Sequence, residues 1–566
     1  MTIPSFPRPV PTIGDQTSAR DRADQPDGWA FPPGDRDALY SVISARRDVR
    51  RFRPDALPRS VLDRLLQAAH NAPSVGHSQP WRFVIVTDQI IREQAAVMAD
   101  RERLRQAKLL DEQSARQLLD LQLEGIREAP IGIVVCCDRR TEAAGVLGRA
   151  TFADADMWSC AGAIQNLWLA ARAEGLGVGW VTLFEPADLA RLIGLPVGVE
   201  TLGWLCLGWP DERNPTPGLE RAGWSRRQDV GELIMYERWE GIGPSVPVSR
   251  LRAPEPAAIV AVRDAADVLL TAPSSLGVLD RALTKIVARR GPGVDRGTLL
   301  LVSGEHLVAD LGVSAYNRSV GIDVLRAAQQ GASIGTAMAA AAGLGVKVVN
   351  AGTSSGDLVT SDALAPDTVE KLFEEGRRLG GELAEVGLVV LGEVGIGNTT
   401  VAAALACVAL DLTPAATVGL GTTSNSEMLD RKQAVVAAAL ERAQASHGAE
   451  LGSLKTLLSA LGGPEFAYLA GAILGAAEAG QMVVLDGFAT TVCALLLVKE
   501  HPGVVAHLVG GQRSSERAHV LALEALGLEP ILDLHLRSGE GVGAVLAAQM
   551  LLTALRVRRS TAATEQ

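Results

Sequence analysis

The tryptophans of this 566-residue chain are confined to its first half, and this distribution constrains the fold most. All nine lie between Trp29 and Trp239, whereas the second half is built largely on Ala, Gly, Leu and Val. A chain of this length is too long for one hydrophobic core, so two or more domains are expected. Residues 241–256 (GIGPSVPVSRLRAPEP) contain four prolines and no apolar periodicity, which predicts a linker.

We therefore expect one domain over residues 35–240 and a second over residues 257–560. Residues 1–34 contain seven prolines and are predicted to form a disordered tail. This start has no continuous apolar segment, so no signal peptide is expected.

The composition excludes several classes of function. A net charge of −11 argues against a nucleic-acid partner or an anionic membrane surface. The longest strongly apolar run, residues 488–498, is too short to span a bilayer. Six cysteines without C-x-x-C spacing predict reduced thiols in a cytoplasmic protein, and the eight histidines show no metal-ligand spacing.

The two halves differ in their order of helices and strands. Helical patterns and buried apolar runs alternate in the first half, which predicts an α+β domain. The helical patterns cover residues 35–47, 59–69, 92–128 and 157–175, and the strand patterns cover 81–87, 131–137 and 202–209. The second half repeats a strand, a glycine-bearing turn and an Ala-rich helix, which predicts a parallel sheet flanked by helices with ligands at the carboxyl ends of its strands. Its strand patterns cover residues 298–303, 346–350, 386–391 and 481–485.

Three arginines lie within five residues at the end of the first helical pattern: Arg46, Arg47 and Arg50. Helix C-termini favour arginine, so this cluster alone is compatible with a simple helix end. Its functional interpretation is a set of guanidiniums that grip a phosphate. Two further segments favour that interpretation, a polar turn over residues 72–83 that leads into a strand, and a Gly-rich turn over residues 175–180 where backbone can approach a flat ring.

Together the blocks RRDVR, AAHNAPSVGHSQPWRFVIV and QNLWLAARAEGLGVGWVTLF resemble the flavin-dependent nitroreductase fold, and most of all the 5,6-dimethylbenzimidazole synthases. The resemblance covers residues 36–240 and implies FMN, as cofactor or consumed substrate, in a homodimer. Arg46, Arg47 and Arg50 would hold its phosphate and ribityl chain, and Gly76 and Gln79 would line the isoalloxazine. The other implied FMN contacts are Asp48, Val49, Gly179, Trp180 and Val181.

Asp48 and Thr182 are the implied catalytic residues of this domain. Asp48 matches a carboxylate typical of the synthases and would handle protons, although helix capping or an ion pair with a neighbouring arginine is the alternative. Thr182 stands where the synthases have Ser. Arg51-Phe52-Arg53 departs from the synthase pattern and is closer to a generic nitroreductase.

A glycine-rich turn follows the strand pattern near residue 391, with the sequence VVLGEVGIGNTT over residues 389–400. Gly395 and Gly397 permit close backbone approach, and the amides of Asn398, Thr399 and Thr400 would face an anion from a helix N-terminus. A single turn of this kind is as often structural as functional. Because Glu393 within it would repel a phosphate, its side chain must face a cation or lie aside.

A second glycine-rich turn, LHLRSGEGVGA over residues 534–544, contains one carboxylate, Glu540. A solvated Glu at a helix start is the simpler interpretation. The functional interpretation is a general base held among backbone amides.

These two turns, with GGPEFAYLAGAILGAAEAG and VVLDGFATT, resemble the nicotinate-nucleotide–dimethylbenzimidazole phosphoribosyltransferases from about residue 272 to 555. The resemblance implies that Glu540 deprotonates the azole base. It implies nucleotide contacts from Gly395, Gly397, Asn398, Thr399, Thr400 and Lys432, and places Ser314 and Tyr316 beside the base. Several of the family's rim motifs are altered here; its H-x-S-x-E, for example, begins with Gln512.

The sequence thus predicts a bifunctional enzyme of cobalamin lower-ligand synthesis. Its first domain would convert reduced FMN and O2 into 5,6-dimethylbenzimidazole, with NAD(P)H as a source of electrons. Its second domain would transfer phosphoribosyl from nicotinate mononucleotide to that base. Two alternatives remain open: the first domain is a generic NAD(P)H-dependent nitroreductase or corrinoid reductase, or the second is a non-catalytic nucleotide-binding module.

Overall fold

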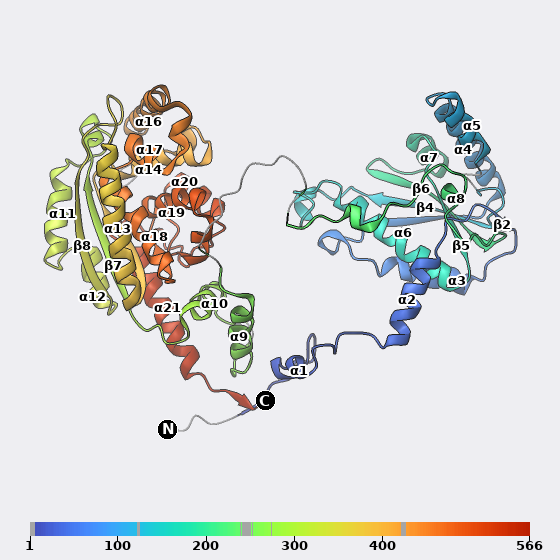
Figure 1. The fold of residues 1–566 in the computed structure, drawn as a ribbon, viewed down its shortest axis with the longest axis horizontal. Coiled ribbons are helices and arrows are strands. Elements are labelled where there is room, and N and C mark those ends of the chain that lie inside the picture. The colour runs from blue at the N-terminus through green and yellow to red at the C-terminus, as the bar shows by residue number, and fades with distance from the viewer. Residues whose placement is uncertain are drawn as a thin grey trace. The chain divides into compact units, whose positions relative to one another are not determined.

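The chain forms two compact units in a computed structural model, which describes residues 6–121, 125–237, 239, 251, 253–272, 274–419 and 426–565 (Figure 1). One unit comprises Met1–Gly28 with Gly243–Gln566, and the other comprises Trp29–Ile242. The division falls within residues 241–256, the segment predicted as a linker, of which residues 241–250 and 252 lie outside the described residues.

The unit of residues 29–242 contains an antiparallel sheet centred on its longest strand, β6 (Val199–Pro210). On one edge β6 pairs with β4, which pairs in turn with β3; on the other it pairs with β5 and, near its end, with the short β2. These strands are β2 (Phe52–Arg53), β3 (Trp81–Val86), β4 (Ile131–Asp138) and β5 (Gly177–Val181).

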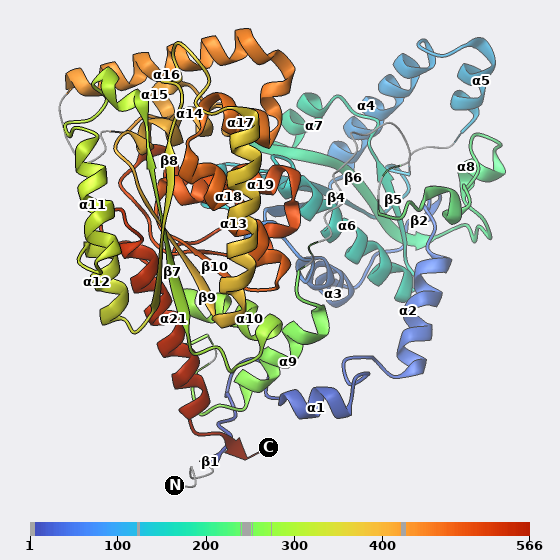
Figure 2. The ribbon, with the colours of Figure 1, turned by 60° about the vertical axis from the view of Figure 1, so that its left-hand side comes forward.

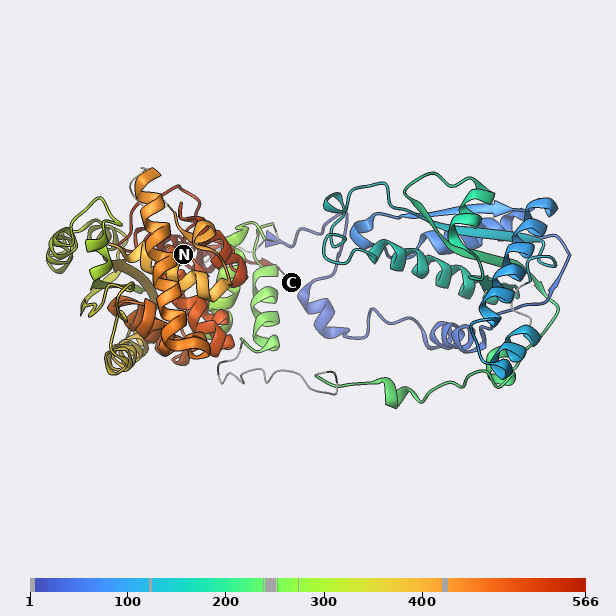
Figure 3. The ribbon, with the colours of Figure 1, turned by 90° about the horizontal axis from the view of Figure 1, so that it is seen from above.

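Helices cover both faces of this sheet because β4 is apolar on both sides. Ile133 and Val135 pack with α3 (Arg59–His70) and α6 (Ala155–Ala173), whereas Val134 and Cys136 pack with α4 (Gln89–Ala107) and α7 (Pro186–Ile193). Figure 3 shows the long helix α6 along one face. The predicted α+β, nitroreductase-like layering is confirmed. Its remaining helices are α2 (Pro33–Ala45), η1 (Val75–His77), η2 (Ala143–Gly145), α8 (Gly218–Arg221) and η3 (Val230–Leu233).

Two predictions for this unit were wrong. The single helix expected over residues 92–128 is two helices, because Asp111 starts a new one, α5 (Glu112–Asp120), by accepting hydrogen bonds from the Gln113 and Ser114 amides. The Gly-rich turn expected over residues 175–180 is mostly strand β5, whose glycines pack against another part of the chain.

The C-terminal unit is built on a five-stranded parallel sheet with the order β11-β10-β9-β7-β8, as the strand–turn–helix pattern predicted. Its strands are β7 (Gly297–Glu305), β8 (Gly345–Thr353), β9 (Leu388–Val394), β10 (Val483–Leu485) and β11 (Leu508–Gly510).

Both faces of the parallel sheet are buried. In β7, Leu300 and Val302 join a core with α13, α14, α17, α18 and α19, whereas Leu299 and Leu301 join a second core with α10, α12 and α21 (Figure 2). These helices are α10 (Val278–Arg290), α12 (Ile334–Ala341), α13 (Pro366–Val386), α14 (Asn398–Leu410), α17 (Leu454–Leu461), α18 (Pro464–Glu478), α19 (Phe488–Glu500) and α21 (Val542–Ser560). The others are α9 (Pro256–Asp267), η4 (Leu307–Leu311), α11 (Ser319–Gln329), α15 (Pro414–Thr417), α16 (Ser426–His447), η5 (Gly448–Gly452), η6 (Pro502–His507) and α20 (Arg517–Ala525).

The N-terminal segment differs from the disordered tail that its prolines predicted. Its strand β1 (Phe6–Pro7) pairs in parallel with β12 (Thr564–Glu565) at the other end of the chain. Helix α1 (Ala19–Asp24) follows, with Ser18 and Asp21 forming a capping box. The tail up to residue 28 therefore belongs to the C-terminal unit, and residues 29–242 are inserted into that unit's chain.

Three further features bear on function. Among the described helices, none combines the length and apolar character needed to cross a bilayer. The described residues contain no group of His, Cys, Asp and Glu side chains arranged to hold a metal ion. All six cysteines are buried thiols outside any disulfide.

Candidate active sites

The segment Arg46–Arg50 leaves the end of α2 and packs directly on β5. The Val49 amide donates to the Val178 carbonyl at 3.0 Å. This contact requires glycine in the strand, because a Cβ on Gly179 would lie 2.3 Å from the Val49 carbonyl oxygen. Gly179 therefore serves chain packing, whereas the sequence suggested that it leaves space for a ligand.

Asp48 is held by the same strand. Its Oδ1 accepts a hydrogen bond from the Trp180 amide at 3.1 Å, and its Oδ2 pairs with Arg50, whose guanidinium also donates to the Trp180 carbonyl at 2.9 Å. Burial raises the pKa of the Asp48 carboxyl, and the Arg50 charge opposes that rise only in part. A carboxyl with a raised pKa is suited to taking up and releasing a proton.

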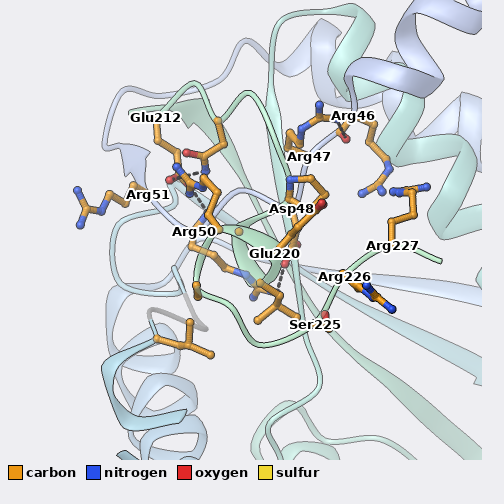
Figure 4. Close-up of a pocket in the computed structure, with 17 residues that line it drawn as sticks. Arg46, Arg47, Asp48, Arg50, Arg51, Glu212, Glu220, Ser225, Arg226 and Arg227 are labelled. Atoms are coloured by element: carbon orange, nitrogen blue, oxygen red, sulfur yellow. Dashed lines mark hydrogen bonds and ion pairs between the residues drawn. The ribbon is translucent and has the colours of Figure 1, made fainter. Parts of the chain in front are cut away.

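A cavity of about 860 Å³ lies over this segment (Figure 4). Seven arginines line it, and only three carboxylates do, so its ligand is expected to be anionic. The arginines are Arg46, Arg47, Arg50, Arg51, Arg221, Arg226 and Arg227, and the carboxylates are Asp48, Glu212 and Glu220.

Arg46 and Arg47 also serve the fold. The Arg46 guanidinium lies over the Trp168 ring, 4.7 Å from its centroid. Arg47 donates to the carbonyls of Ser44 at 2.7 Å and Pro215 at 2.5 Å, while its buried Nε has no hydrogen-bond partner among the described residues. An unpaired buried donor beside an arginine-lined cavity fits an anionic group bound there.

The other predicted flavin and catalytic residues of this domain do not line the cavity: Val49, Gly76, Gln79, Gly179, Trp180, Val181 and Thr182. Gly76 and Gln79 follow α3, both with positive φ (54° and 49°), and Gln79 lines a separate hollow with His70 and Trp81. Thr182 is exposed just after β5. One protomer therefore does not bring the predicted FMN contacts into one cavity.

The C-terminal unit holds a second cavity, of about 400 Å³, where the turn after β9 meets the turn before α21. It brings together most of the residues predicted for the transferase site. These are Ser314, Tyr316, Gly395, Gly397, Asn398, Thr399, Lys432 and Glu540.

The glycine loop after β9 forms the N-terminus of α14, with Gly397 as N-cap at φ 95°. Its amides are partly engaged within the turn: the Thr399 amide donates to Asn398 Oδ1 at 2.8 Å, and the Thr400 amide to the Gly397 carbonyl at 3.0 Å. Thr400 is 1% exposed and is not among the residues that line the cavity, so its predicted contact through the backbone amide stays a prediction. The helix N-terminus itself still presents positive partial charge to an anion.

Glu540 occupies a strained position, since its φ is +61°. Its Oε2 accepts a hydrogen bond from the Gly335 amide, in the first turn of α12, at 3.2 Å. A Cβ on Gly335 would lie 2.1 Å from the Glu540 carbonyl oxygen, so glycine is required there. The fold thus holds the Glu540 carboxylate at a helix N-terminus on the cavity wall.

Two further carboxyls line the same cavity. Burial, with the neighbouring Glu465 and Asp486, raises the pKa of Glu393 to about 8. Burial likewise raises the pKa of Asp486 to about 6, against hydrogen bonds from backbone amides and Gln512. Glu393 lies aside from the loop's amides, because its Oε2 accepts a hydrogen bond from the Asn398 side chain.

Lys432 is a buried cation of this cavity, 5% exposed, on α16. Burial lowers the pKa of its ammonium, and Glu516 opposes that effect. The cavity lining therefore combines a helix N-terminus and a lysine with four carboxylates: Glu393, Asp486, Glu516 and Glu540.

Comparison with known proteins assigns both units. The profile of the family described as Phosphoribosyltransferase matches residues 251–566, and that of the Nitroreductase family matches residues 43–209. The 5,6-dimethylbenzimidazole synthase of Rhodospirillum rubrum is 43% identical over 203 residues, which are 36% of this chain and 95% of that protein. The nicotinate-nucleotide–dimethylbenzimidazole phosphoribosyltransferase of Bradyrhizobium is 35% identical over 315 residues, 52% of this chain and 89% of that protein. The chain belongs to both families.

A solved structure supports the assignment of the phosphoribosyltransferase domain. The crystal structure of CobT from Thermus thermophilus is 35% identical, with a TM-score of 0.51, and the match covers 54% of this chain and 97% of that one. The chain is thus a fusion of a nitroreductase-type domain with a phosphoribosyltransferase domain.

Sequence reasoning missed several cavity residues. In the nitroreductase-type domain these are Arg221, at the end of α8, and Arg226 and Arg227, in the loop that follows. This segment has no motif, and the pair of adjacent arginines was the available signal. In the phosphoribosyltransferase domain they are Asp486 and Gln512. Asp486 lies in the block VVLDGFATT, where a carboxylate directly after a strand of a parallel sheet was the available signal.

Proposed function

We propose that this chain carries out two successive steps of cobalamin lower-ligand synthesis, formation of 5,6-dimethylbenzimidazole and its phosphoribosylation. One observation carries the proposal: a single chain spans 95% of a dimethylbenzimidazole synthase and 89% of a phosphoribosyltransferase whose name includes the same base. The product of the first reaction is then the substrate of the second. The relatives favour this over a generic reductase or a non-catalytic module.

In the transferase step, the azole's unprotonated nitrogen attacks the ribose C1′ of nicotinate mononucleotide. The bond from C1′ to the pyridinium nitrogen breaks, its electron pair returns to the ring, and nicotinate leaves without needing a proton. The azole's N–H proton goes to a base, for which we propose Glu540. A positioned general base contributes about 10²–10⁴ in rate.

The lining of the transferase cavity suits this substrate. The helix N-terminus after Gly397 and the Lys432 ammonium are complementary to the 5′-phosphate. Carboxylates elsewhere on the wall are complementary to the cationic pyridinium and to the cationic azole that forms as the new bond is made. Ser314 and Tyr316 lie on the same wall and are proposed to flank the base.

The arginine-lined cavity of the nitroreductase-type domain suits FMN. We propose that Arg46, Arg47 and Arg50 bind its phosphate and ribityl chain, together with Arg226 and Arg227. FMN supplies both the redox chemistry and the carbon skeleton of the base, with O2 as the oxidant and NAD(P)H as the source of electrons. Asp48, with its raised pKa, is proposed to transfer protons. Thr182, which lies outside the cavity of its own protomer, is proposed as a second catalytic residue.

We propose that a homodimer completes the flavin site. Gly76 and Gln79 do not line the arginine cavity of their own protomer, so a second copy would supply them. Helix α2 has no buried residue, and Leu39, Tyr40 and Ile43 on it are 53%, 68% and 45% exposed. An apolar helix surface of this kind is typical of a subunit interface. Six buried cysteines without a disulfide are consistent with the cytoplasm as the site of action.

The direct test is mass spectrometry of the products that the purified protein forms from reduced FMN, O2 and nicotinate mononucleotide. We expect 5,6-dimethylbenzimidazole, α-ribazole 5′-phosphate and nicotinate. Recovery of intact FMN alone would contradict the synthase assignment. Absence of transfer to added dimethylbenzimidazole would contradict the transferase assignment.

A further inference from the structure

A buried His–Glu pair lies behind the phosphate loop, outside the cavity. His306, after β7, and Glu465, in the first turn of α18, are 1% and 0% exposed. His306 Nε2 and Glu465 Oε1 are 2.6 Å apart. Burying two ionisable side chains is costly and seldom improves stability over apolar packing, so their presence here needs another explanation.

The pair is incompletely satisfied. Glu465 Oε2 and His306 Nδ1 are both buried without a hydrogen-bond partner among the described residues. Unpaired buried polar atoms are rare in folded proteins and often mark functional strain. The fold also leaves room for this arrangement, because a Cβ on Gly304 would lie 2.0 Å from Glu465 Oε2 and one on Gly463 would lie 2.3 Å from the His306 ring.

The pair contacts the loop from behind at Gly395. A Cβ built on Gly395 would lie 2.8 Å from the Gly304 carbonyl oxygen, 3.1 Å from His306 Nε2 and 3.2 Å from Glu465 Oε1, so the pair lies close behind this glycine and leaves no room for a larger residue. We therefore expect a change at the pair to be felt at Gly395, and through it at the N-terminus of α14. The pair is therefore placed to fix the loop that faces the nucleotide phosphate.

The pair also acts electrostatically on Glu393, two residues before Gly395. The Glu465 charge is the largest influence after burial that raises the Glu393 pKa to about 8. The other groups that face Glu393 are Asp486 and Glu540, which also raise its pKa, and the Asn398 amide, which lowers it. A neutral Glu393 leaves the cavity less negative when a phosphate enters.

We propose that His306 and Glu465 are positioning residues of the transfer reaction, acting on the cavity through Gly395 and Glu393. Neither touches the substrate. The inference rests on the proposed transferase activity and extends it to two residues behind the cavity wall. In this inference the pair fixes the position of the loop, and it keeps Glu393 neutral so that the cavity is less negative toward the nucleotide.

The test is the pH profile of kcat/KM for nicotinate mononucleotide in the full-length protein, with dimethylbenzimidazole supplied. In the wild type we expect kcat/KM to fall above about pH 8 as Glu393 ionises. Glu465→Gln removes a like charge, which lowers the Glu393 pKa. The alkaline limb of the pH profile, where kcat/KM falls, should therefore move about one pH unit lower. Glu465→Asp keeps the charge and should keep the limb near its wild-type position.

Ser459→Ala is the matched control, because it removes one buried hydrogen bond, to the Leu364 carbonyl, in the same unit. It should lower the melting temperature without moving the limb. A limb unmoved in Glu465→Gln would overturn the proposal. If the wild type shows no transfer at any pH, the proposed function itself fails, which is a separate outcome.

If Glu465→Gln does not fold, the variant His306→Gln tests the proposal instead. This variant keeps the Glu465 charge but removes the imidazole ring that lies behind Gly395. We expect KM for the nucleotide to rise about tenfold, as for the loss of one hydrogen bond to a charged group, with the limb in place. An unchanged KM would overturn the proposal.

Discussion

Asp48 shows how one side chain can serve both the fold and the chemistry. Its Oδ1 is engaged by the Trp180 amide, which fixes the carboxyl, while Oδ2 pairs with Arg50 at the edge of the arginine cavity. The Asp48 side chain remains 39% exposed in spite of these contacts. A group held in this way can exchange a proton with a ligand without moving.

Asp48→Asn separates these two roles. The amide oxygen still accepts from Trp180, so the fold and FMN binding should be retained, with the FMN Kd within about threefold of wild type. The amide cannot take up a proton, so dimethylbenzimidazole formation from reduced FMN should stop. Product analysis and a flavin titration measure the two effects. Asp55→Asn, which alters only an exposed pair with Arg53, is the control.

The arginines of the cavity fall into two groups, those whose loss should weaken only FMN binding and those whose loss should also lower the melting temperature. Arg226→Ala with Arg227→Ala removes two exposed side chains, so FMN affinity should fall by roughly tenfold or more for each lost phosphate contact, with the melting temperature unchanged. Arg46→Ala with Arg47→Ala should lower affinity and stability together, because Arg47 also donates hydrogen bonds to three backbone carbonyls. Flavin titration and thermal melts test this. An unchanged affinity in both double variants would contradict the assignment.

Glu393 should make the stability of the C-terminal unit depend on pH. Its pKa rises from 4.5 in the unfolded chain to about 8 in the folded one, so the folded state binds the extra proton. Its contribution is fully present below pH 4.5 and is lost as the pH rises through 8. The melting temperature of this unit should therefore fall between pH 6 and pH 8.5, and less so in Glu393→Gln. Circular dichroism melts measure it, with the exposed Glu450→Gln as control.

Single residues could be predicted from the sequence, whereas the contacts between residues distant in the chain could not. The loop glycines, Lys432 and Glu540 could be named from the sequence because they lie in local motifs, and the structure places them around one cavity. The Glu465–His306 pair was not, because its members are 159 residues apart and only the fold brings them together. Thr400 differs from Thr399 in lying outside the cavity lining, because one residue of helical rotation turns its side chain into the core.

Among the elements, the N-terminal segment departs most from its composition. Asp267, at the end of α9, contacts the N-terminal segment at three points. Its Oδ2 lies 3.2 Å from Arg8 Nη2, 3.3 Å from the Ala19 amide and 3.7 Å from Arg22 Nη2. Proline-rich composition predicted disorder because local sequence carries no signal for a partner more than 240 residues distant. The same lack of a local signal explains why β5 was predicted as a turn. Its glycines pack against Val49, a residue that is distant in the sequence.

Asp267→Asn should loosen this segment. Exposed or half-buried ion pairs contribute about 0–1 kcal/mol each, so the melting temperature should change little. Trypsin, however, should cut after Arg20 and Arg22 several-fold faster, because local opening needs less free energy than global unfolding. Asp24→Asn, which breaks only the exposed pair with Arg20, is the control and should leave the cleavage rate unchanged. Equal rates in both variants would show that Asp267 does not hold the segment.

For the whole molecule, the insertion of residues 29–242 into the chain of the C-terminal unit gives two hydrophobic cores joined at two points. Each unit has apolar clusters of its own. Units with separate cores are expected to unfold separately unless a large interface couples them. The tryptophans that revealed the division in the sequence also provide the means to test it.

Ligands should stabilise the two units independently. All nine tryptophans lie between Trp29 and Trp239, so tryptophan fluorescence reports unfolding of the flavin-binding unit alone, while circular dichroism reports both. FMN at 100 times its Kd contributes about 2.7 kcal/mol. For a unit of this size that should raise the fluorescence transition by roughly 5–10 °C. Nicotinate mononucleotide should raise only the other transition, seen by circular dichroism. If the nucleotide moved the fluorescence transition equally, the two units would have to unfold as one, because a ligand stabilises only the cooperative unit that binds it.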